Sequence, residues 1–318
     1  MLTYILFIIG FVLLIKGAYF LVDGSGSIAK KLKIPSLVIG LTVVAFGTSA
    51  PEAVVNVLAS LSGNTEIAIG NILGSNIANI FLILGISSII YPLTAQKNTV
   101  IKEIPFSLLA ALLVGFMAND MLLEGRMFSE ISRIDGLILL SFFVIFIYYI
   151  VGISKNGVDS EEDSLPMYSI GRSIFFIFFG LVGLVLGGKW IVDGAVAMAL
   201  SFGVSQSLVG LTIVAIGTSL PELATSVVAA RKKQSDIAIG NIVGSNIFNI
   251  FWILGISALI NPMPFSAKSN PDIFMAIVAS LLLFLTMYIG KRHVIERWQG
   301  FVMVAIYLCY LLFLILTQ

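Results

Sequence analysis

Residues 47–52 read GTSAPE, and residues 217–222, which lie 170 positions later, read GTSLPE. Each hexapeptide lies inside a strongly apolar stretch and brings one proline and one carboxylate into it. A carboxylate in hydrocarbon is costly and usually functional, and a proline interrupts a helix because it has no N–H to donate. The repeated hexapeptide therefore predicts two broken membrane helices that build one site between them.

The repeat extends beyond the hexapeptides. Residues 70–79 read GNILGSNIAN and residues 240–249 read GNIVGSNIFN. Between residues 66–90 and 236–260, 19 of 25 positions are identical. The chain is therefore built from two copies of one unit.

The composition is that of a membrane protein. The chain has 318 residues, of which 58% are hydrophobic and 11% charged, and its mean hydropathy is +1.07. These values indicate a polytopic membrane protein. The net charge of +1 gives no attraction to nucleic acid, and the single cysteine excludes a disulfide framework or a thiolate metal cluster. We interpret the apolar N-terminus as a first membrane helix, not a cleaved signal peptide.

Ten segments are long and apolar enough to cross a membrane, for which roughly 20 residues are needed. They cover residues 2–22, 36–61, 67–91, 104–119, 134–153, 170–200, 206–230, 237–260, 272–290 and 298–316. Because five crossings are an odd number, the second copy has the opposite orientation to the first. We therefore predict an all-α membrane protein with ten transmembrane helices, arranged as two inverted five-helix repeats with broken helices at the midplane.

A polar stretch divides the two repeats. The predicted organisation is a first repeat at residues 1–153, a cytosolic linker at residues 154–169 and a second, inverted repeat at residues 170–318. The acidic run at 159–163 is interpreted as solvated, and not as a regulatory cation site, because it lacks the spacing of a ligand loop.

The basic residues predict the orientation. Outside the spans, thirteen lysines and arginines lie on the linker side and three on the other side. Positive residues favour the cytoplasmic face. We therefore expect a multi-pass protein of the cell membrane with both termini extracytoplasmic.

The two breaks expose oxygen atoms. Pro51 leaves the carbonyl of Gly47 without its helical partner, and Pro221 does the same to the carbonyl of Gly217. Freed carbonyls cannot face lipid, and a bound cation would satisfy them. Further oxygens come from side chains near the breaks and on the helix face of the second phrase: Thr48, Ser49, Glu52, Ser75 and Asn79 in the first copy, and Thr218, Ser219, Glu222, Ser245 and Asn249 in the second.

This ligand set contains only oxygen, because the single histidine, His293, lies in a basic loop. Oxygen ligands favour hard cations such as calcium and sodium over zinc or copper. One divalent ion or two monovalent ions neutralise Glu52 and Glu222, so competition for this pair would couple the ions. An empty site would leave two desolvated carboxylates unpaired, which disfavours crossing the membrane without an ion.

Other residues of the repeated phrases have less specific roles. Asn71 and Asn241 are equally compatible with tying down the broken backbone and with touching an ion. The glycine pairs Gly70/Gly74 and Gly240/Gly244 are interpreted as helix-packing contacts.

Both phrases resemble the α-repeats of the sodium/calcium exchanger family, within the cation/calcium antiporter superfamily. The matching patterns are Gly-Thr-Ser-x-Pro-Glu and Gly-Asn-x-x-Gly-Ser-Asn-x-x-Asn, each present twice, and the ten-span arrangement covers nearly the whole chain. The chain most resembles the short prokaryotic members, because it lacks a large cytosolic insert. The resemblance also implies that the first and sixth helices slide past the core during transport.

The resemblance implies a set of ion ligands. A calcium site would use Glu52 and Glu222 with the backbone oxygens of Thr48 and Thr218. Flanking sodium sites would use Ala45, Ser49 and Ser75 in the first copy and Ala215, Ser219 and Ser245 in the second, while Asn79 and Asn249 would line the centre. Some relatives, notably potassium-dependent exchangers and certain prokaryotic ones, carry Asp where Asn249 stands, so the amide argues against potassium dependence.

The resulting hypothesis is a secondary antiporter that exchanges sodium for calcium, with no covalent chemistry and no cofactor. Its expected partners are calcium, sodium and the lipid bilayer, with no nucleic acid and no required oligomer. The alternative is a proton/calcium antiporter that uses the same glutamates as proton acceptors. A cation channel and an intramembrane enzyme are further alternatives, although the enzyme lacks a His-Glu-x-x-His motif.

Overall fold

The computed structural model describes residues 2–123, 125, 127–155, 167–202 and 215–317. Eight helices among these residues are long and apolar enough to cross a membrane: Leu2–Leu32, Thr65–Ile90, Thr99–Met117, Arg133–Ser154, Ile170–Ser201, Ser235–Ile260, Ala267–Thr286 and Arg297–Leu316. A further pair, Ser36–Thr48 and Ala50–Leu61, passes the same test together but is bent by 48°. The chain is therefore a largely helical, multi-pass membrane protein.

The first half contains helices interrupted by π-helical turns. They are α1 (Leu2–Leu32), α2 (Ser36–Ile39), η1 (Gly40–Val44), α3 (Ala45–Thr48), α4 (Ala50–Leu61), α5 (Thr65–Ala78), η2 (Asn79–Leu84), α6 (Gly85–Ile90), η3 (Thr99–Glu103), α7 (Ile104–Met117), α8 (Asp120–Leu123) and α9 (Arg133–Ser154).

The described elements of the second half follow a similar order. They are α10 (Ile170–Ser201), α12 (Ala215–Thr218), α13 (Leu220–Arg231), α14 (Ser235–Ile247), η5 (Phe248–Leu254), α15 (Gly255–Ile260), the 3-10 turn η6 (Ala267–Ser269), α16 (Asn270–Thr286) and α17 (Arg297–Thr317).

The expected spans and the observed helices agree at most boundaries. The main difference is the first helix, which was expected to end at residue 22 but continues to Leu32. This polar extension packs into the protein: Ser25 and Ser27 are buried, and the Ser27 hydroxyl lies 3.0 Å from that of Ser173 on α10. The expected span at 206–230 falls partly on residues 206–214, outside the described residues, as does the acidic run at 159–163.

The structure adds four short strands that an all-α fold does not contain. β1 (Leu93–Thr94) pairs antiparallel with β4 (Val294–Ile295), and β2 (Ser129–Ile131) pairs antiparallel with β3 (Met263–Phe265). Because each pair takes one strand from each half, the two halves are joined by backbone hydrogen bonds as well as by packing. The sequence did not reveal these strands, since each has only two or three residues.

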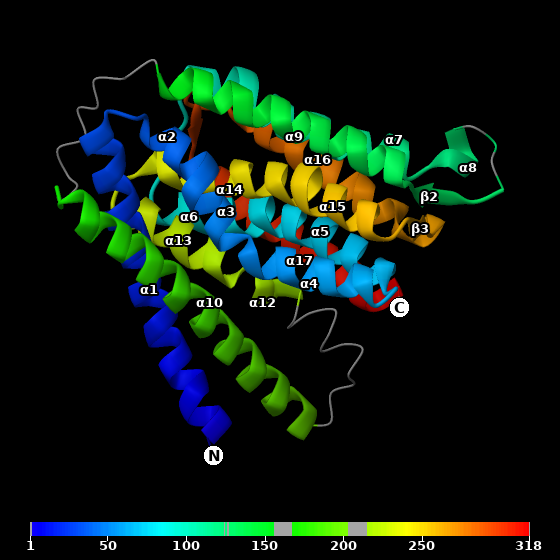
Figure 1. Cartoon of the computed structure of the whole chain (residues 1–318), viewed down its shortest axis with the longest axis horizontal. Coiled ribbons are helices and arrows are strands. Elements are labelled where there is room, and N and C mark those ends of the chain that lie inside the picture. The colour runs from blue at the N-terminus through cyan, green and yellow to red at the C-terminus, as the bar shows by residue number, and fades with distance from the viewer. Residues whose placement is uncertain (1, 124, 126, 156–166, 203–214, 318) are drawn as a thin grey trace.

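Helices α1 and α10 lie side by side and cross the remaining helices at an angle (Figure 1). Small residues at intervals of seven allow their backbones to touch. On α1 these are Gly10, Gly17 and Gly24, which face Gly187, Gly180 and Ser173 of α10. A Cβ placed on Gly17 would lie 2.8 Å from the carbonyl oxygen of Gly180, so any larger residue would push the two helices apart.

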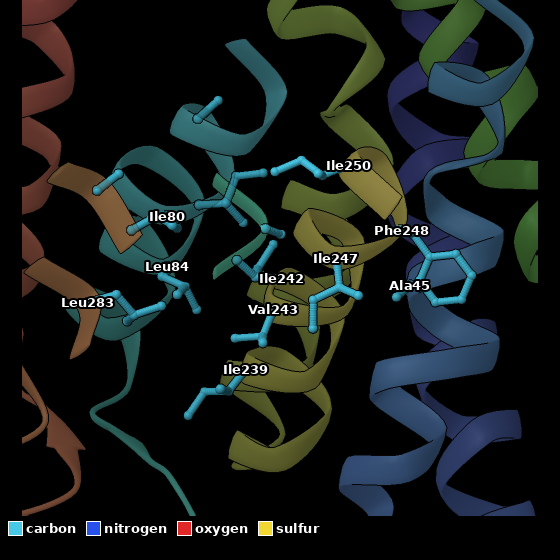
Figure 2. Close-up of a cluster of buried hydrophobic side chains, with 14 of the residues drawn as sticks. Ala45, Ile80, Leu84, Ile239, Ile242, Val243, Ile247, Phe248, Ile250 and Leu283 are labelled. Carbon is cyan, nitrogen blue, oxygen red and sulfur yellow. The ribbon is translucent and has the colours of Figure 1, made fainter. Parts of the chain in front are cut away.

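The centre of the protein is formed by the two helices that carry the second repeated phrase. In the most apolar 18-residue stretch of Thr65–Ile90 and of Ser235–Ile260, 78% and 83% of the residues are buried. In the corresponding stretches of the other six long helices, 22–39% are buried. Figure 2 shows Ile242, Val243 and Ile247 of α14 beside Ile80 and Leu84 of η2. Because both helices are enclosed by protein, their polar side chains face other protein groups and not lipid.

Candidate cation-binding site

Two helix breaks bring the repeated hexapeptides to the centre of the protein. Helix α3 ends at Thr48 and α4 begins at Ala50, with Ser49 between them at φ −80° and ψ 6°. The second copy breaks in the same way at Ser219, which has φ −87° and ψ 7°. Both prolines lie in the first turn after the break, where a missing N–H costs nothing. The predicted interruption is therefore confirmed in both copies.

The two glutamates lie in the first turn after each break, and both are buried. Glu52 and Glu222 are each 1% exposed. Their carboxylates interact electrostatically with each other. Two like charges enclosed by protein repel, and a cation between them converts that repulsion into attraction. The geometry therefore brings together the pair of acids that the repeat predicts.

Each carboxylate accepts a hydrogen bond from the opposite half of the chain. The Ser49 hydroxyl donates to Oε1 of Glu222 over 3.0 Å, and the Ser219 hydroxyl donates to Oε1 of Glu52 over 3.3 Å. A hydroxyl that donates its proton keeps two lone pairs. Both serines can therefore hold a carboxylate and ligate a cation at the same time.

Six buried oxygen atoms of the predicted residues have no hydrogen-bond partner among the described residues. They are Oε2 of Glu52 and Glu222, Oγ of Ser75 and Ser245, and Oδ1 of Asn79 and Asn249. Three come from each half. Unsatisfied polar atoms in a protein interior are costly and few, and a hard cation is a ligand that would satisfy this set.

Two asparagines hold the threonines of the breaks. The Thr48 hydroxyl donates to Oδ1 of Asn241 over 3.0 Å, and the Thr218 hydroxyl donates to Oδ1 of Asn71 over 3.3 Å. The amide of Asn241 also donates to Oγ of Ser226 over 3.0 Å. Of the two roles left open for these asparagines, the structure shows the first, because Oδ1 of each accepts a hydroxyl of a threonine at the break; contact with an ion stays a prediction.

The two alanines contribute only backbone atoms. The carbonyl of Ala45 accepts a hydrogen bond from the backbone N–H of Ser49 over 3.0 Å and lies 3.3 Å from the Thr48 hydroxyl, as a second and longer acceptor beside Asn241. Ala215 begins α12. Their role as sodium ligands stays a prediction.

Further polar residues lie at the centre beside the predicted ligands. Asn76 and Asn246, which the second phrase places near the site as additional amides, lie where the two halves meet, and the amide of each donates to the backbone carbonyl of the other over 3.3 Å. One turn beyond the glutamates, the Asn56 amide donates to the carbonyl of Glu52 over 2.7 Å, and Ser226 occupies the equivalent position in the second half. Asn56 and Ser226 each lie four residues after a glutamate and therefore on the same helix face. Sequence reasoning could have used this spacing to find them.

The glycine pairs divide between the two copies. Gly240 and Gly244 contact the backbone of α2 and η1, and a Cβ on Gly244 would lie 2.9 Å from the carbonyl oxygen of Leu41. The packing interpretation is therefore confirmed for this pair. A Cβ added to Gly70 or Gly74 would meet no atom of the described residues within 4 Å, so a helix-packing role for this pair stays a prediction.

Comparison with known proteins gives matches over nearly the whole chain. The family described as sodium/calcium exchanger protein matches residues 2–152 and 172–316. The inner membrane protein YrbG of Escherichia coli is 36% identical over 291 residues, covering 87% of each chain. The sodium/calcium exchanger MaX1 of Methanosarcina acetivorans is 32% identical over 344 aligned positions, covering 98% of each chain. Among solved structures, the sodium-calcium exchanger NCX_Mj, soaked with 10 mM Na+ and zero Ca2+, superposes with a TM-score of 0.83 at 35% identity, covering 98% of each chain.

Proposed function

The chain belongs to the sodium/calcium exchanger family, and from this premise we propose that it is a secondary antiporter that exchanges sodium for calcium across the membrane. The observation that carries the proposal is the pair of buried carboxylates, Glu52 and Glu222, surrounded by unpaired oxygen atoms from both halves. The family transports ions and performs no covalent chemistry, so we assign no catalytic residue and no cofactor.

In this proposal calcium binds between Glu52 and Glu222, with the backbone oxygens of Thr48 and Thr218 as further ligands. Calcium takes six to eight oxygen ligands in flexible geometry. The two hydroxyl–carboxylate bonds between the halves support the assignment, because they hold the carboxylates without consuming the lone pairs that a cation needs.

Sodium occupies flanking positions in this proposal. Their ligands are Ala45, Ser49 and Ser75 in the first half and Ala215, Ser219 and Ser245 in the second, with Asn79 and Asn249 between them. Sodium is close to calcium in size, so both ions compete for the same carboxylates. The Ser245 hydroxyl supports this arrangement, since it is buried and interacts with the Glu222 carboxylate.

Exchange follows from the cost of an empty site. Two desolvated carboxylates without a counter-ion cost several kcal/mol each, so the protein crosses between its two access states only when ions neutralise them. One calcium ion or two sodium ions provide that neutralisation. Transport of one ion in one direction is thereby tied to transport of the other ion in return.

The proposed architecture is ten spans in two inverted repeats of five, residues 1–153 and 170–318, joined by a cytosolic linker at residues 154–169. Among the described residues there are eight candidate spans, or nine if the bent pair crosses the membrane as one span, which is compatible with this proposal. Helices α12 and α13 belong to the tenth proposed span, at residues 206–230. Ten crossings, with the basic residues on the cytoplasmic side, leave both termini extracytoplasmic.

Calcium flux into proteoliposomes tests the function. Radioactive calcium uptake is measured with the purified chain while outward gradients of sodium, potassium and protons are imposed one at a time. We expect uptake only when sodium is inside, at clamped pH. Uptake that follows the proton gradient and ignores sodium identifies a proton/calcium antiporter, and uptake without any counter-ion identifies a channel.

A further inference from the structure

Four asparagines form a closed hydrogen-bonded group where the two halves meet. The Asn76 amide donates to the backbone carbonyl of Asn246, and the Asn246 amide donates to the backbone carbonyl of Asn76, each over 3.3 Å. The Asn79 amide donates to Oδ1 of Asn246, and the Asn249 amide donates to Oδ1 of Asn76, each over 2.9 Å. All four residues are at most 4% exposed.

The two backbone carbonyls determine the orientation of the whole group. A carbonyl can only accept, so the side-chain atom of Asn76 that faces the Asn246 carbonyl must be the NH2 group. The Asn76 side-chain oxygen then faces the opposite way, toward Asn249. The same reasoning applies to Asn246 and its neighbour Asn79.

The orientation is passed to the next asparagine. Because Oδ1 of Asn76 can only accept, Asn249 must present its NH2 group to it, which leaves Oδ1 of Asn249 pointing away. By the same logic, Oδ1 of Asn79 points away from Asn246. These two oxygens are the ones that are buried without a partner among the described residues.

We propose that Asn76 and Asn246 are positioning residues that lock the amides of Asn79 and Asn249 with their oxygens, and not their NH2 groups, toward the transported ion. The inference rests on the proposed function and adds to it a reason for cation selectivity. An asparagine amide is nearly symmetric in shape, so a half-turn about its last bond would present an N–H donor that repels a cation. The anchored group makes that half-turn costly, because it would set two oxygens or two N–H groups against each other.

The position of the group at the start of the π-helical turns is consistent with this role. Asn76 and Asn246 occupy the last turn of α5 and α14, directly before η2 and η5. Turns of the π type are rare and occur often at functional sites. Here η2 and η5 follow Asn76 and Asn246, whose backbone carbonyls accept hydrogen bonds from side-chain amides of the opposite half.

A double-mutant cycle tests the proposal. The four proteins are wild type, Asn76→Ala, Asn249→Asp and the double variant, and calcium affinity is measured by titration calorimetry on purified chains without sodium. In the wild-type background, we expect N76A to weaken calcium binding about 10–100-fold, the usual effect of removing an outer-shell partner of a metal ligand. In the N249D background, we expect N76A to change affinity little or to raise it, because both terminal atoms of a carboxylate are oxygen and no orientation needs to be held.

Equal losses in the two backgrounds overturn the proposal, since a merely structural Asn76 would matter equally in both. Asn119→Ala serves as the control, because Asn119 lies just after the end of α7 and its amide donates to the Gly115 carbonyl of that helix, so the substitution should leave affinity unchanged. If N76A does not fold, the cycle of Asn246→Ala with Asn79→Asp removes the equivalent contact from the other half and is decided in the same way. A wild-type chain that binds neither calcium nor sodium contradicts the proposed function itself, whereas equal losses contradict this inference alone.

Discussion

The hydroxyl of Ser49 lies 3.0 Å from Oε1 of Glu222, a carboxylate 173 positions later in the chain. Ser219 makes the equivalent contact with Glu52 over 3.3 Å. Each half of the chain therefore supplies the hydrogen-bond donor for the carboxylate of the other half. A single half would leave both its serine and its glutamate without these partners, so the site exists only when the two halves are packed together.

Neutralising either glutamate should abolish calcium transport and leave the fold intact. In Glu52→Gln or Glu222→Gln, the amide keeps the size of the side chain but removes one of the two charges that hold a divalent ion. Removing a desolvated charge also relieves a cost of several kcal/mol, so the melting temperature should stay the same or rise. Calcium uptake and thermal unfolding of the purified variants measure the two effects. Glu66→Gln, an exposed carboxylate at the start of α5, is the control; near-normal uptake by E52Q or E222Q would remove the site assignment.

Removing the serine hydroxyls of the second phrase should reduce transport without destabilising the protein. The hydroxyls of Ser75 and Ser245 are buried. The Ser75 hydroxyl has no hydrogen-bond partner among the described residues, so Ser75→Ala loses an ion ligand but no internal bond and should stabilise the fold by about 1 kcal/mol. Ser245→Ala also removes an interaction with the Glu222 carboxylate, so its stability should stay close to that of the wild type. Sodium-driven calcium uptake and melting temperature are compared with those of Ser280→Ala, whose hydroxyl bonds to the Ala276 carbonyl on α16. A large loss of stability together with unchanged transport would contradict the ligand role.

An ion pair links helix α1 to the core, and the equivalent aspartate of α10 pairs differently. Lys232, directly after α13, bonds to Asp23 of α1 and lies 4.8 Å from the centre of the Tyr19 ring. The equivalent residue of the second half, Asp193, pairs instead with Lys189 on its own helix over 3.2 Å, and both side chains are more than half exposed. If α1 slides past the core, as the family resemblance implies, only the first of these pairs resists the motion.

Breaking the Asp23–Lys232 pair should therefore shift the balance between the two access states. The side chains are 17% and 22% exposed, so we expect an effect of about 1 kcal/mol, the upper end for exposed pairs, or roughly a fivefold change in exchange rate. Asp23→Asn and the charge-reversed double variant Asp23→Lys/Lys232→Asp are compared in vesicles of known orientation. The reversal should restore the wild-type rate, and Asp193→Asn should have no effect. An equal response to D23N and D193N would show that the pair does not hold α1.

Enlarging a glycine between α1 and α10 should destabilise the protein. A side chain at Gly17 would meet backbone atoms of Gly180 and Leu184 at 2.8 and 2.9 Å, and backbone cannot move aside as a flexible side chain can. Gly17→Val should cost about 1–3 kcal/mol, the usual range for overpacking, and lower the melting temperature. Gly171→Ala at the start of α10, which meets no described atom within 4 Å, should be neutral or stabilising by about 0.5–1 kcal/mol. Equal melting temperatures for G17V and wild type would refute close contact of the two helices.

The helical spans, the two breaks and the acidic pair were predictable from the residues, because each depends on local chemistry. Hydrophobic runs of about 20 residues specify membrane helices in any context. A proline interrupts its own helix whatever surrounds it, which is why Pro51 and Pro221 identified both breaks. The repeat of 170 positions then showed that the two glutamates were equivalent.

The contacts across the two halves could not be predicted in this way. In the extension of α1 to Leu32, the Ser27 hydroxyl meets that of Ser173, which lies far along the chain. The partners of the site residues likewise lie about 150–190 positions away, as in the bond from Thr48 to Asn241. The local sequence pattern determines where the helices form and where they break. Which hydroxyl or amide meets which oxygen is decided only when two distant segments pack together, because a hydrogen bond requires two atoms within about 3 Å of each other.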